Sequence, residues 1–310
     1  MPRGLKRYGE DVNGLLLLNK PSGVTSNKAL QIVRKLLNAK KAGHTGSLDP
    51  AATGMLPLCF GQATKVCKYL LNSDKSYLVT ATLGIATDTG DREGKEISNS
   101  PIPNKSSKEW EKIIQSFVGR SNQIPPMHSA LKINGKRLYE IARHGEKIDR
   151  KPRPIEISSI NLLESSLSQL IFRVRCSKGT YIRTLVEDIA KKAGTVAYTS
   201  KLHRESVGDF KSENMIEMSV IESLVEQDIN NIREKLLPVD IALLGMPKLT
   251  INPNNVAKFC AGQKIKDFSD RKNGLTRVYK SDQKFIGIGE VTPNGALSPR
   301  RIFITHEKTS

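Results

Sequence analysis

The 310-residue chain carries 49 Lys and Arg against 31 Asp and Glu, giving a formal net charge of +18 and a pI near 9.7. This excess favours a polyanionic partner, with nucleic acid first, and the length suits one large and one small domain. An anionic membrane would also attract the chain, but its apolar runs, such as residues 15–18, are far too short for a spanning segment.

The sequence shows no signal for metal binding, redox chemistry or export. The cysteines lack the close spacing of a zinc site or a redox motif, and we expect reduced core thiols at Cys59, Cys67, Cys176 and Cys260. The five histidines are scattered, so no metal is expected. Residues 1–10 are polar and basic without an apolar h-region, so we expect a cytoplasmic protein.

The N-terminal part of the chain predicts alternating strands and helices. Residues 12–19 form an apolar strand, and a helix with an apolar face begins at about Ser26. Residues 43–54 are too rich in Gly, Thr, Asp and Pro for regular structure and predict a fixed loop. A buried strand over residues 55–60 and a helix over residues 62–71 follow.

Two alternating strands are predicted over residues 76–84 and 170–176, and the first places Tyr77 on its buried face. A helix with an apolar stripe follows from Thr180. Because the elements lack a strict βαβ rhythm and a GxGxxG turn, we expect an α+β domain whose mixed, mostly antiparallel sheet is flanked by helices.

Composition divides the chain into a large domain over residues 1–246 and a small β-rich domain over residues 247–310. The second region has short strands between turns and carries 12 basic against 5 acidic residues. Within the first, an insertion at about residues 124–153 is strongly basic, with eight basic and three acidic residues over 130–153. This insertion predicts a flap that closes over RNA, and a solvated charged hairpin is a compatible alternative.

Residues 43–54 (GHTGSLDPAATG) place one carboxylate, Asp49, on a tight turn that Pro50 stiffens, with His44 five residues upstream. Asp49 could activate a substrate, or it could cap the turn as isolated Asp-Pro pairs usually do. Asp88 and Asp91 in residues 87–91 (TDTGD) are interpreted as turn-forming carboxylates rather than metal ligands.

A second motif, residues 178–183 (KGTYIR), predicts a need for an anion. Thr180 is a good N-cap, but Arg183 stands three residues later, where a capping box has Glu or Gln. A cation in the first turn opposes the helix dipole and costs about 0.3 to 1 kcal/mol if uncompensated. Either an anionic group lies against Arg183, or its side chain extends into solvent.

Four motifs, in order and at similar spacing, resemble the TruB-type tRNA pseudouridine synthases. They are residues 43–65 (GHTGSLDPAATGMLPLCFGQATK), 76–84 with 87–91 (SYLVTATLG and TDTGD), 125–145 (PPMHSALKINGKRLYEIARHG) and 177–189 (SKGTYIRTLVEDI). The resemblance covers nearly the whole chain, including residues 20–26 (KPSGVTS), and implies the pseudouridine synthase fold with a PUA-like C-terminal domain that binds RNA.

At the matching positions, the resemblance implies a catalytic set and a substrate-binding set. The catalytic set is Asp49 as the carboxylate, Arg183 as its ion-pair partner, and Tyr77 against the target base. The substrate-binding set is Tyr77, Tyr181 and Leu202 around the base, His44 inserted into the T loop, and Lys20 in a supporting motif with Pro21. His128 stands where the family usually has an aromatic residue, which affects a contact of the flap rather than the reaction.

The implied reaction isomerises the T-loop uridine of tRNA and needs no cofactor. The N1 to C1′ bond breaks, the uracil rotates while bound, and C5 joins C1′. Asp49 could attack C1′ or remove a sugar proton, and the sequence leaves both routes open. The carboxylate must start ionised in a pocket that excludes water, and Arg183 would offset the cost of its burial.

Two other functions remain open at this point. The first is a non-catalytic RNA-binding protein or tRNA folding chaperone, since the charge and the C-terminal domain would serve binding alone. The second is an N-glycosidase, although most glycosidases use two carboxylates and the sequence offers one well-placed candidate. We expect tRNA as the partner, no obligatory protein partner, no membrane association and a monomer.

Overall fold

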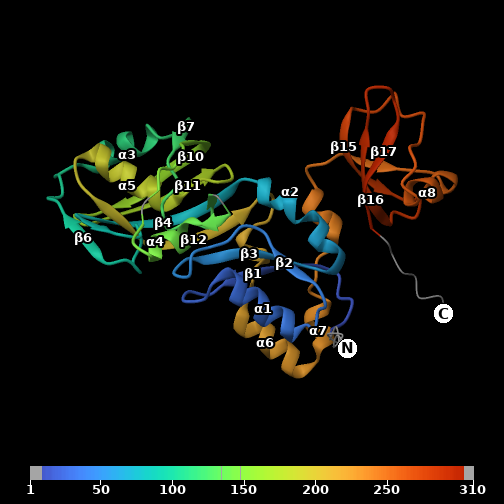
Figure 1. Cartoon of the computed structure of the whole chain (residues 1–310), viewed down its shortest axis with the longest axis horizontal. Coiled ribbons are helices and arrows are strands. Elements are labelled where there is room, and N and C mark those ends of the chain that lie inside the picture. Colours follow the sequence, from blue (N-terminus) through green and yellow to red (C-terminus); the bar gives the residue numbers. More distant parts are fainter. Residues whose placement is uncertain (1–8, 134, 147, 304–310) are drawn as a thin grey trace.

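A nine-stranded sheet organises the larger part of the chain (Figure 1), in a computed structural model that describes residues 9–133, 135–146 and 148–303. The expectation about export concerned residues 1–10, and residues 1–8 lie outside the described residues. The strand order is β13-β1-β3-β12-β4-β11-β10-β7, with β2 paired to β3. The strands are β1 (Gly14–Lys20), β2 (Ala42–His44), β3 (Thr53–Phe60), β4 (Lys75–Leu83), β7 (Gly119–Gln123), β10 (Arg153–Ser165), β11 (Gln169–Cys176), β12 (Ala197–Val207) and β13 (Ile216–Glu217).

The sheet is mixed and mostly antiparallel, which confirms the predicted α+β class. Two pairings are parallel, β1 with β13 and β12 with β3, and the other pairings of this sheet are antiparallel. The β12 to β3 pairing is short, and it brings Arg204 beside Gly54. The loop that carries Asp49 therefore begins where β2 ends and closes where β3 meets β12.

Two groups of helices cover the two halves of this sheet (Figure 1). Helices α1 (Ser26–Leu36), α6 (Met218–Gln227) and α7 (Ile229–Arg233) pack their apolar residues on β1 and β3. Helices α3 (Ser107–Gln115) and α5 (Ile182–Ala193) pack on β4, β10 and β11. Alternation along β4 sends Tyr77 and Val79 into this second core, as the period of two predicts.

Three predicted boundaries differ from the structure. The predicted helix over residues 62–71 is a 3-10 turn, η1 (Gly61–Val66), followed by a short helix, α2 (Cys67–Asn72). The predicted loop over residues 43–54 is shorter, because β2 and β3 take up its two ends. Helix α5 begins at Ile182 with Tyr181 as N-cap, so Thr180 is not the cap: its Oγ1 donates to the Ser177 carbonyl at 3.0 Å and closes the preceding turn.

The basic insertion contains a small hairpin and a short helix. Strands β8 (Lys132–Ile133) and β9 (Lys136–Arg137) pair antiparallel, and α4 (Leu138–Arg143) follows directly. A second hairpin, β5 (Ile85–Thr87) with β6 (Glu96–Asn99), flanks the TDTGD turn. The remaining connections include two further 3-10 turns, η2 (Ser212–Asn214) and η3 (Val239–Leu243).

The C-terminal region has a sheet and an apolar core of its own, set apart from the large sheet in Figure 1. Its elements are β14 (Lys248–Thr250), α8 (Pro253–Cys260), β15 (Gly274–Tyr279), β16 (Phe285–Val291) and β17 (Leu297–Ile302). A shared apolar cluster of Val66, Leu243, Ile288 and Phe303 joins it to η1 and η3. The two regions therefore pack directly against each other at this junction.

The cysteines match their prediction in part. Cys59 and Cys176 are buried free thiols, whereas Cys67 is half-buried and Cys260 is exposed. The expectation of a core thiol is therefore wrong for Cys260, which ends α8 on its solvent side. Among the described residues, no three potential ligands cluster as a metal site, and no helix is long and apolar enough to cross a membrane.

Candidate active site

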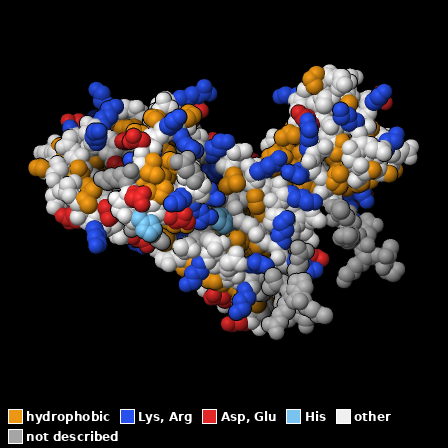
Figure 2. Space-filling view, in the orientation of Figure 1, with side chains coloured by type: hydrophobic (Ala, Val, Ile, Leu, Met, Phe, Trp, Pro, Cys, Tyr) orange, Lys and Arg blue, Asp and Glu red, His pale blue; other side chains and the backbone are white. Residues whose placement is uncertain are grey.

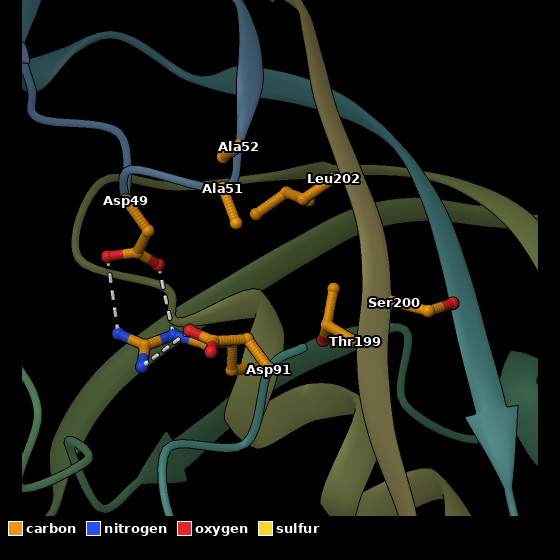
Figure 3. Close-up of a pocket in the computed structure, with 8 residues that line it drawn as sticks. Asp49, Ala51, Ala52, Asp91, Thr199, Ser200 and Leu202 are labelled. Atoms are coloured by element: carbon orange, nitrogen blue, oxygen red, sulfur yellow. Dashed lines mark hydrogen bonds and ion pairs between the residues drawn. The ribbon is translucent and has the colours of Figure 1, made fainter. Parts of the chain in front are cut away.

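Asp49 and Arg183, which are 134 residues apart in sequence, form an ion pair. The Arg183 Nε lies 3.0 Å from Asp49 Oδ2, and Nη2 donates to Oδ1 at 3.4 Å. Figure 3 shows the Asp49 carboxylate facing the guanidinium, with the Asp91 carboxylate beside the same group. The two-point contact fixes the plane of the Asp49 carboxylate as well as its distance.

Arg183 makes three further contacts that use the rest of its guanidinium. Nη1 lies 3.3 Å from Asp91 Oδ2 and donates to the Thr89 carbonyl at 2.7 Å, while Nη2 donates to the His128 carbonyl at 2.7 Å. The Arg183 side chain is 6% exposed, against 39% for Asp49, which faces the cleft. The two carboxylates supply the anionic partners that the first-turn arginine requires. His128 accepts through its main-chain carbonyl, so this contact does not depend on which side chain residue 128 carries.

Asp91 has the predicted turn-forming role and a second role that the sequence reading missed. Its Oδ1 accepts from Thr89 Oγ1 at 2.7 Å and from the Glu93 amide at 3.0 Å, which closes the turn. Its other oxygen lies 3.3 Å from Arg183 Nη1, the guanidinium nitrogen that does not contact Asp49. The TDTGD motif at residues 87–91 indicated a carboxylate in a turn. Local sequence could not show that this carboxylate contacts Arg183.

Lys20 holds the loop of Asp49 and is not among the residues that line the cleft described below, and its predicted place among the substrate-binding residues stays a prediction. Its ammonium is fully buried and donates to the carbonyls of Pro21 at 2.8 Å, Val24 at 2.7 Å and Pro50 at 3.1 Å. Burial lowers the pKa of Lys20 to about 8, and the nearby Asp49 carboxylate opposes that change. The ammonium thus ties the turn after β1 to the residue that follows Asp49.

We expect Lys20→Met to lower kcat about 10-fold and the free energy of unfolding by about 2 kcal/mol, because three buried carbonyls lose their donor. Affinity for RNA should change little. Single-turnover kinetics and thermal unfolding measure the two effects, with Lys28→Met on the exposed face of α1 as the control. Wild-type kcat in Lys20→Met would contradict this positioning role.

Arg204 on β12 is a second buried cation that the sequence analysis did not identify. It is 1% exposed; its Nε donates to the Met55 carbonyl at 2.6 Å and its Nη2 to the Gly46 carbonyl at 3.0 Å. Gly54 allows this approach, since a Cβ at its φ of +100° would lie 2.3 Å from the Arg204 carbonyl oxygen. Arg204 therefore fixes the start of the Asp49 loop from the side opposite Lys20.

A cleft of about 320 Å³ opens beside the ion pair. Five of the predicted residues line it together, namely Asp49, Tyr77, Tyr181, Arg183 and Leu202. Leu202 points from β12 toward Ala51, whereas Ser200 points to the other side of that strand (Figure 3). The walls offer an aromatic and apolar surface of the kind that holds a flat base, with one carboxylate at the end.

The main chain of Tyr181 is held by Gln123, another residue that the sequence analysis missed. The buried Gln123 side chain accepts from the Tyr181 amide at 2.8 Å and donates to its carbonyl at 3.1 Å. This pair of bonds replaces the missing side-chain cap of α5. It thereby fixes where the helix, and Arg183 in its first turn, begin.

His44 ends β2, half-buried, two residues before Gly46, which lines the cleft. The residues that line the cleft do not include His44 itself. Burial, and then the charge of Arg204, lower the pKa of His44, which keeps the imidazole neutral at pH 7. A neutral ring of this kind suits stacking against bases, and the predicted insertion into RNA stays a prediction.

The pKa of Asp49 is raised, first by burial and then by the Asp91 carboxylate, while Arg183 and Lys20 oppose the rise. Because the reaction that the family resemblance implies needs the ionised form, we expect kcat/KM to increase with pH through this raised pKa and level off above it. The free energy of unfolding changes with pH in the opposite direction. The folded state binds the Asp49 proton more tightly than the unfolded state does, so the contribution of Asp49 to stability falls as pH rises from about 3.8 through the folded pKa. A pH profile whose acid limb lies at or below pH 3.8 would contradict the raised pKa.

Three protein-family patterns match the chain in order. The TruB family pseudouridylate synthase (N terminal domain) matches residues 34–182, the tRNA pseudouridylate synthase B C-terminal domain matches 183–244, and the pseudouridine synthase II TruB C-terminal pattern matches 247–303. A protein named tRNA pseudouridine synthase B from Pseudomonas syringae pv. syringae is 45% identical over 299 residues, which cover 96% of this chain and 98% of that protein. The chain belongs to the TruB family of pseudouridine synthases.

A further relative agrees with this TruB-family membership, and two solved structures share the fold. A tRNA pseudouridine synthase B from Nitrosococcus oceani is 40% identical over 305 residues, 98% of this chain and 99% of that protein. A crystal structure of a Cbf5-Nop10-Gar1 complex superposes with a TM-score of 0.73 at 24% identity, covering 96% of this chain and 86% of that chain. An archaeal box H/ACA sRNP Nop10-Cbf5 complex gives 0.71 at 21% identity, covering 98% and 94%. The chain therefore has the pseudouridine synthase fold, and as a TruB-family member it is an isomerase.

Proposed function

We propose that this chain converts the T-loop uridine of tRNA, position 55, into pseudouridine. The observation that carries the proposal is the Asp49–Arg183 ion pair at the end of a cleft lined by Tyr77, Tyr181 and Leu202. The relatives named tRNA pseudouridine synthase B, which match over almost the whole chain, support tRNA as the substrate. We further propose that the protein works as a cytoplasmic monomer and without a cofactor.

Four side chains of the cleft have a role in this reaction. The Asp49 carboxylate, held by Arg183, either attacks C1′ or removes a sugar proton as the N1 to C1′ bond breaks. Tyr77 and Leu202 hold the detached uracil while it rotates, because their apolar surfaces impose no single orientation on its polar edge. C5 then joins C1′, which displaces Asp49 in the first route, whereas in the second route Asp49 returns the sugar proton. The C5 proton passes to water and N1 takes up a proton, so the product is an isomer of the uridine.

The target base must leave its stack to reach Asp49, which costs a few kcal/mol. His44 is proposed to fill the vacated space in the T loop. The basic insertion at about residues 124–153 already contributes Ser129 and Ala130 to the cleft, which supports its role as a clasp over RNA. Figure 2 shows Lys and Arg side chains over the visible face of the molecule, including the junction of the two regions, where they could contact phosphates.

We propose the division into a catalytic domain over residues 1–246 and a PUA-like RNA-binding domain over residues 247–310. Separate sheets and separate apolar cores support it. The shared cluster of Val66, Leu243, Ile288 and Phe303 would be exposed by deleting the second domain. Its role is therefore better tested by replacing exposed lysines such as Lys264 and Lys266 with Gln and measuring RNA affinity.

The test is tritium release from T-arm RNA that carries C5-labelled uridine. Release without free uracil is expected for isomerisation, since the C5 proton is lost and the base stays attached. Free uracil would indicate an N-glycosidase, but the second nearby carboxylate, Asp91, is committed to Arg183, Thr89 and Glu93 and does not flank a substrate bond. RNA binding without release would favour a binding protein or chaperone.

A further inference from the structure

One polar group in the wall of the catalytic cleft has no partner. Among the described residues, several buried side-chain polar atoms lack a hydrogen bond, and Ser129 Oγ is the one that belongs to a residue lining this cleft. Ser129 is 5% exposed. A buried hydroxyl without a partner is uncommon in folded proteins and calls for a physical reason.

The main chain around Ser129 is firmly held, so the missing partner is not a sign of a loose segment. The Ser129 amide donates to the Met127 carbonyl at 2.9 Å, and its carbonyl accepts from the Tyr139 amide at 3.0 Å. The preceding carbonyl, that of His128, accepts from Arg183 at 2.7 Å. Ser129 is therefore one residue away from a direct contact with the arginine that holds Asp49.

The other polar groups at this end of the cleft are already engaged. Asp49 and Arg183 bond to each other, and Arg204 donates to two main-chain carbonyls. Tyr77 and Leu202 offer mainly flat or apolar surface. A nucleotide that enters the cleft has a ribose 2′-hydroxyl and two uracil carbonyls to satisfy, and the Ser129 hydroxyl can bond with one of them.

We propose that Ser129 is a substrate-binding residue whose hydroxyl hydrogen-bonds to the 2′-hydroxyl or to a uracil carbonyl oxygen of the target nucleotide. The inference rests on the proposed function. It explains why a hydroxyl stands at a buried position where the part of the chain that the structure describes gives it no partner. The substrate supplies the missing partner, so the bond forms when the basic insertion and the nucleotide meet.

Ser129→Ala in the full-length protein tests the proposal, because it removes the hydroxyl and little else. We expect kcat/KM on T-arm RNA to fall about 10-fold, with a similar rise in Kd. The Tm should stay the same or rise, because an unpaired buried hydroxyl destabilises the free protein. Ser129→Cys, which keeps the size but donates poorly, should behave like Ser129→Ala.

The matched control is Thr195→Val, which removes another buried hydroxyl without a partner from a residue outside the cleft lining. It should also keep or raise Tm, but leave kcat/KM within about 2-fold of wild type. A Ser129→Ala protein with wild-type kcat/KM and Kd would overturn the proposal. So would a fall in Tm like that of a lost internal bond, since the hydroxyl would then be structural.

RNAs with a changed target nucleotide identify the bonded oxygen. 2′-Deoxyuridine removes the ribose hydroxyl, and 2-thiouridine and 4-thiouridine weaken one carbonyl each. The difference in Kd between wild type and Ser129→Ala should vanish on one of these RNAs and persist on the others. A difference that persists on all three overturns the contact, whereas a wild-type protein that releases no tritium from unmodified RNA would instead refute the proposed function.

Discussion

Replacing Asp49 by Asn is expected to lower kcat for pseudouridine formation at least about 10,000-fold, the scale of losing a residue that reacts directly with substrate. The amide keeps the shape of the side chain and can still accept from Arg183, but it can neither attack C1′ nor take a sugar proton. Tritium release from C5-labelled T-arm RNA measures the loss. It should be seen at saturating RNA, because the defect lies in the chemical step.

Affinity for tRNA should stay within about 2-fold of wild type in Asp49→Asn, since affinity comes mainly from Lys and Arg contacts to phosphate. Asp88→Asn is the control. Asp88 is an exposed carboxylate whose Oδ1 accepts from the Lys95 amide at 2.8 Å, and it does not line the cleft. An Asp49→Asn protein with normal turnover would remove Asp49 from the mechanism.

Arg183→Met is expected to lower kcat about 1,000-fold and the free energy of unfolding by about 3 kcal/mol. The substitution leaves Asp49 and Asp91 close together without the cation that separates them. Each carboxylate then disfavours ionisation of the other, so the pKa of Asp49 rises further and less of the reactive form is present at pH 7. The carbonyls of Thr89 and His128 also lose their donor.

Arg183→Lys separates charge from geometry. Lysine keeps the cation but cannot bond to the carboxylate at two points, so we expect a kcat between those of Arg183→Met and wild type. The acid limb of the pH profile should move upward from wild type to Lys to Met. Equal turnover in the Met and Lys variants would show that the charge of residue 183 does not matter.

The control for stability is Arg173→Met. Arg173 also contacts a carboxylate at two points, with bonds of 2.8 and 3.0 Å to Glu205, but its side chain is 50% exposed. Surface pairs of this kind contribute about 1 kcal/mol or less, so Arg173→Met should unfold almost like wild type and keep its kcat. A loss at Arg183 no larger than the loss at Arg173 would contradict a structural role for the buried network.

Local sequence determined the regular elements and the kind of chemistry available to this protein. The period of two over residues 76–84 placed Tyr77 on the buried face, where it lies. The apolar stripe after Thr180 predicted α5, although the helix begins two residues later because Gln123 takes the place of a local cap. The Asp-Pro turn indicated a carboxylate held in a fixed position, and the first-turn arginine indicated a cation that lacked an anion. The family resemblance implied that these two groups form an ion pair.

Tertiary structure alone decided which distant groups meet. The short parallel pairing of β12 with β3 brings Arg204 against Gly54, and the buried lysine that ends β1 reaches Pro50 across the turn. Periodicity reports which face of an element is buried, but it carries no information about sheet register or about which loops converge. Side chains such as those of Lys20, Arg204 and Gln123 bond to main-chain carbonyls and amides. Because these groups occur at nearly every position, the sequence does not indicate which of them a side chain will contact.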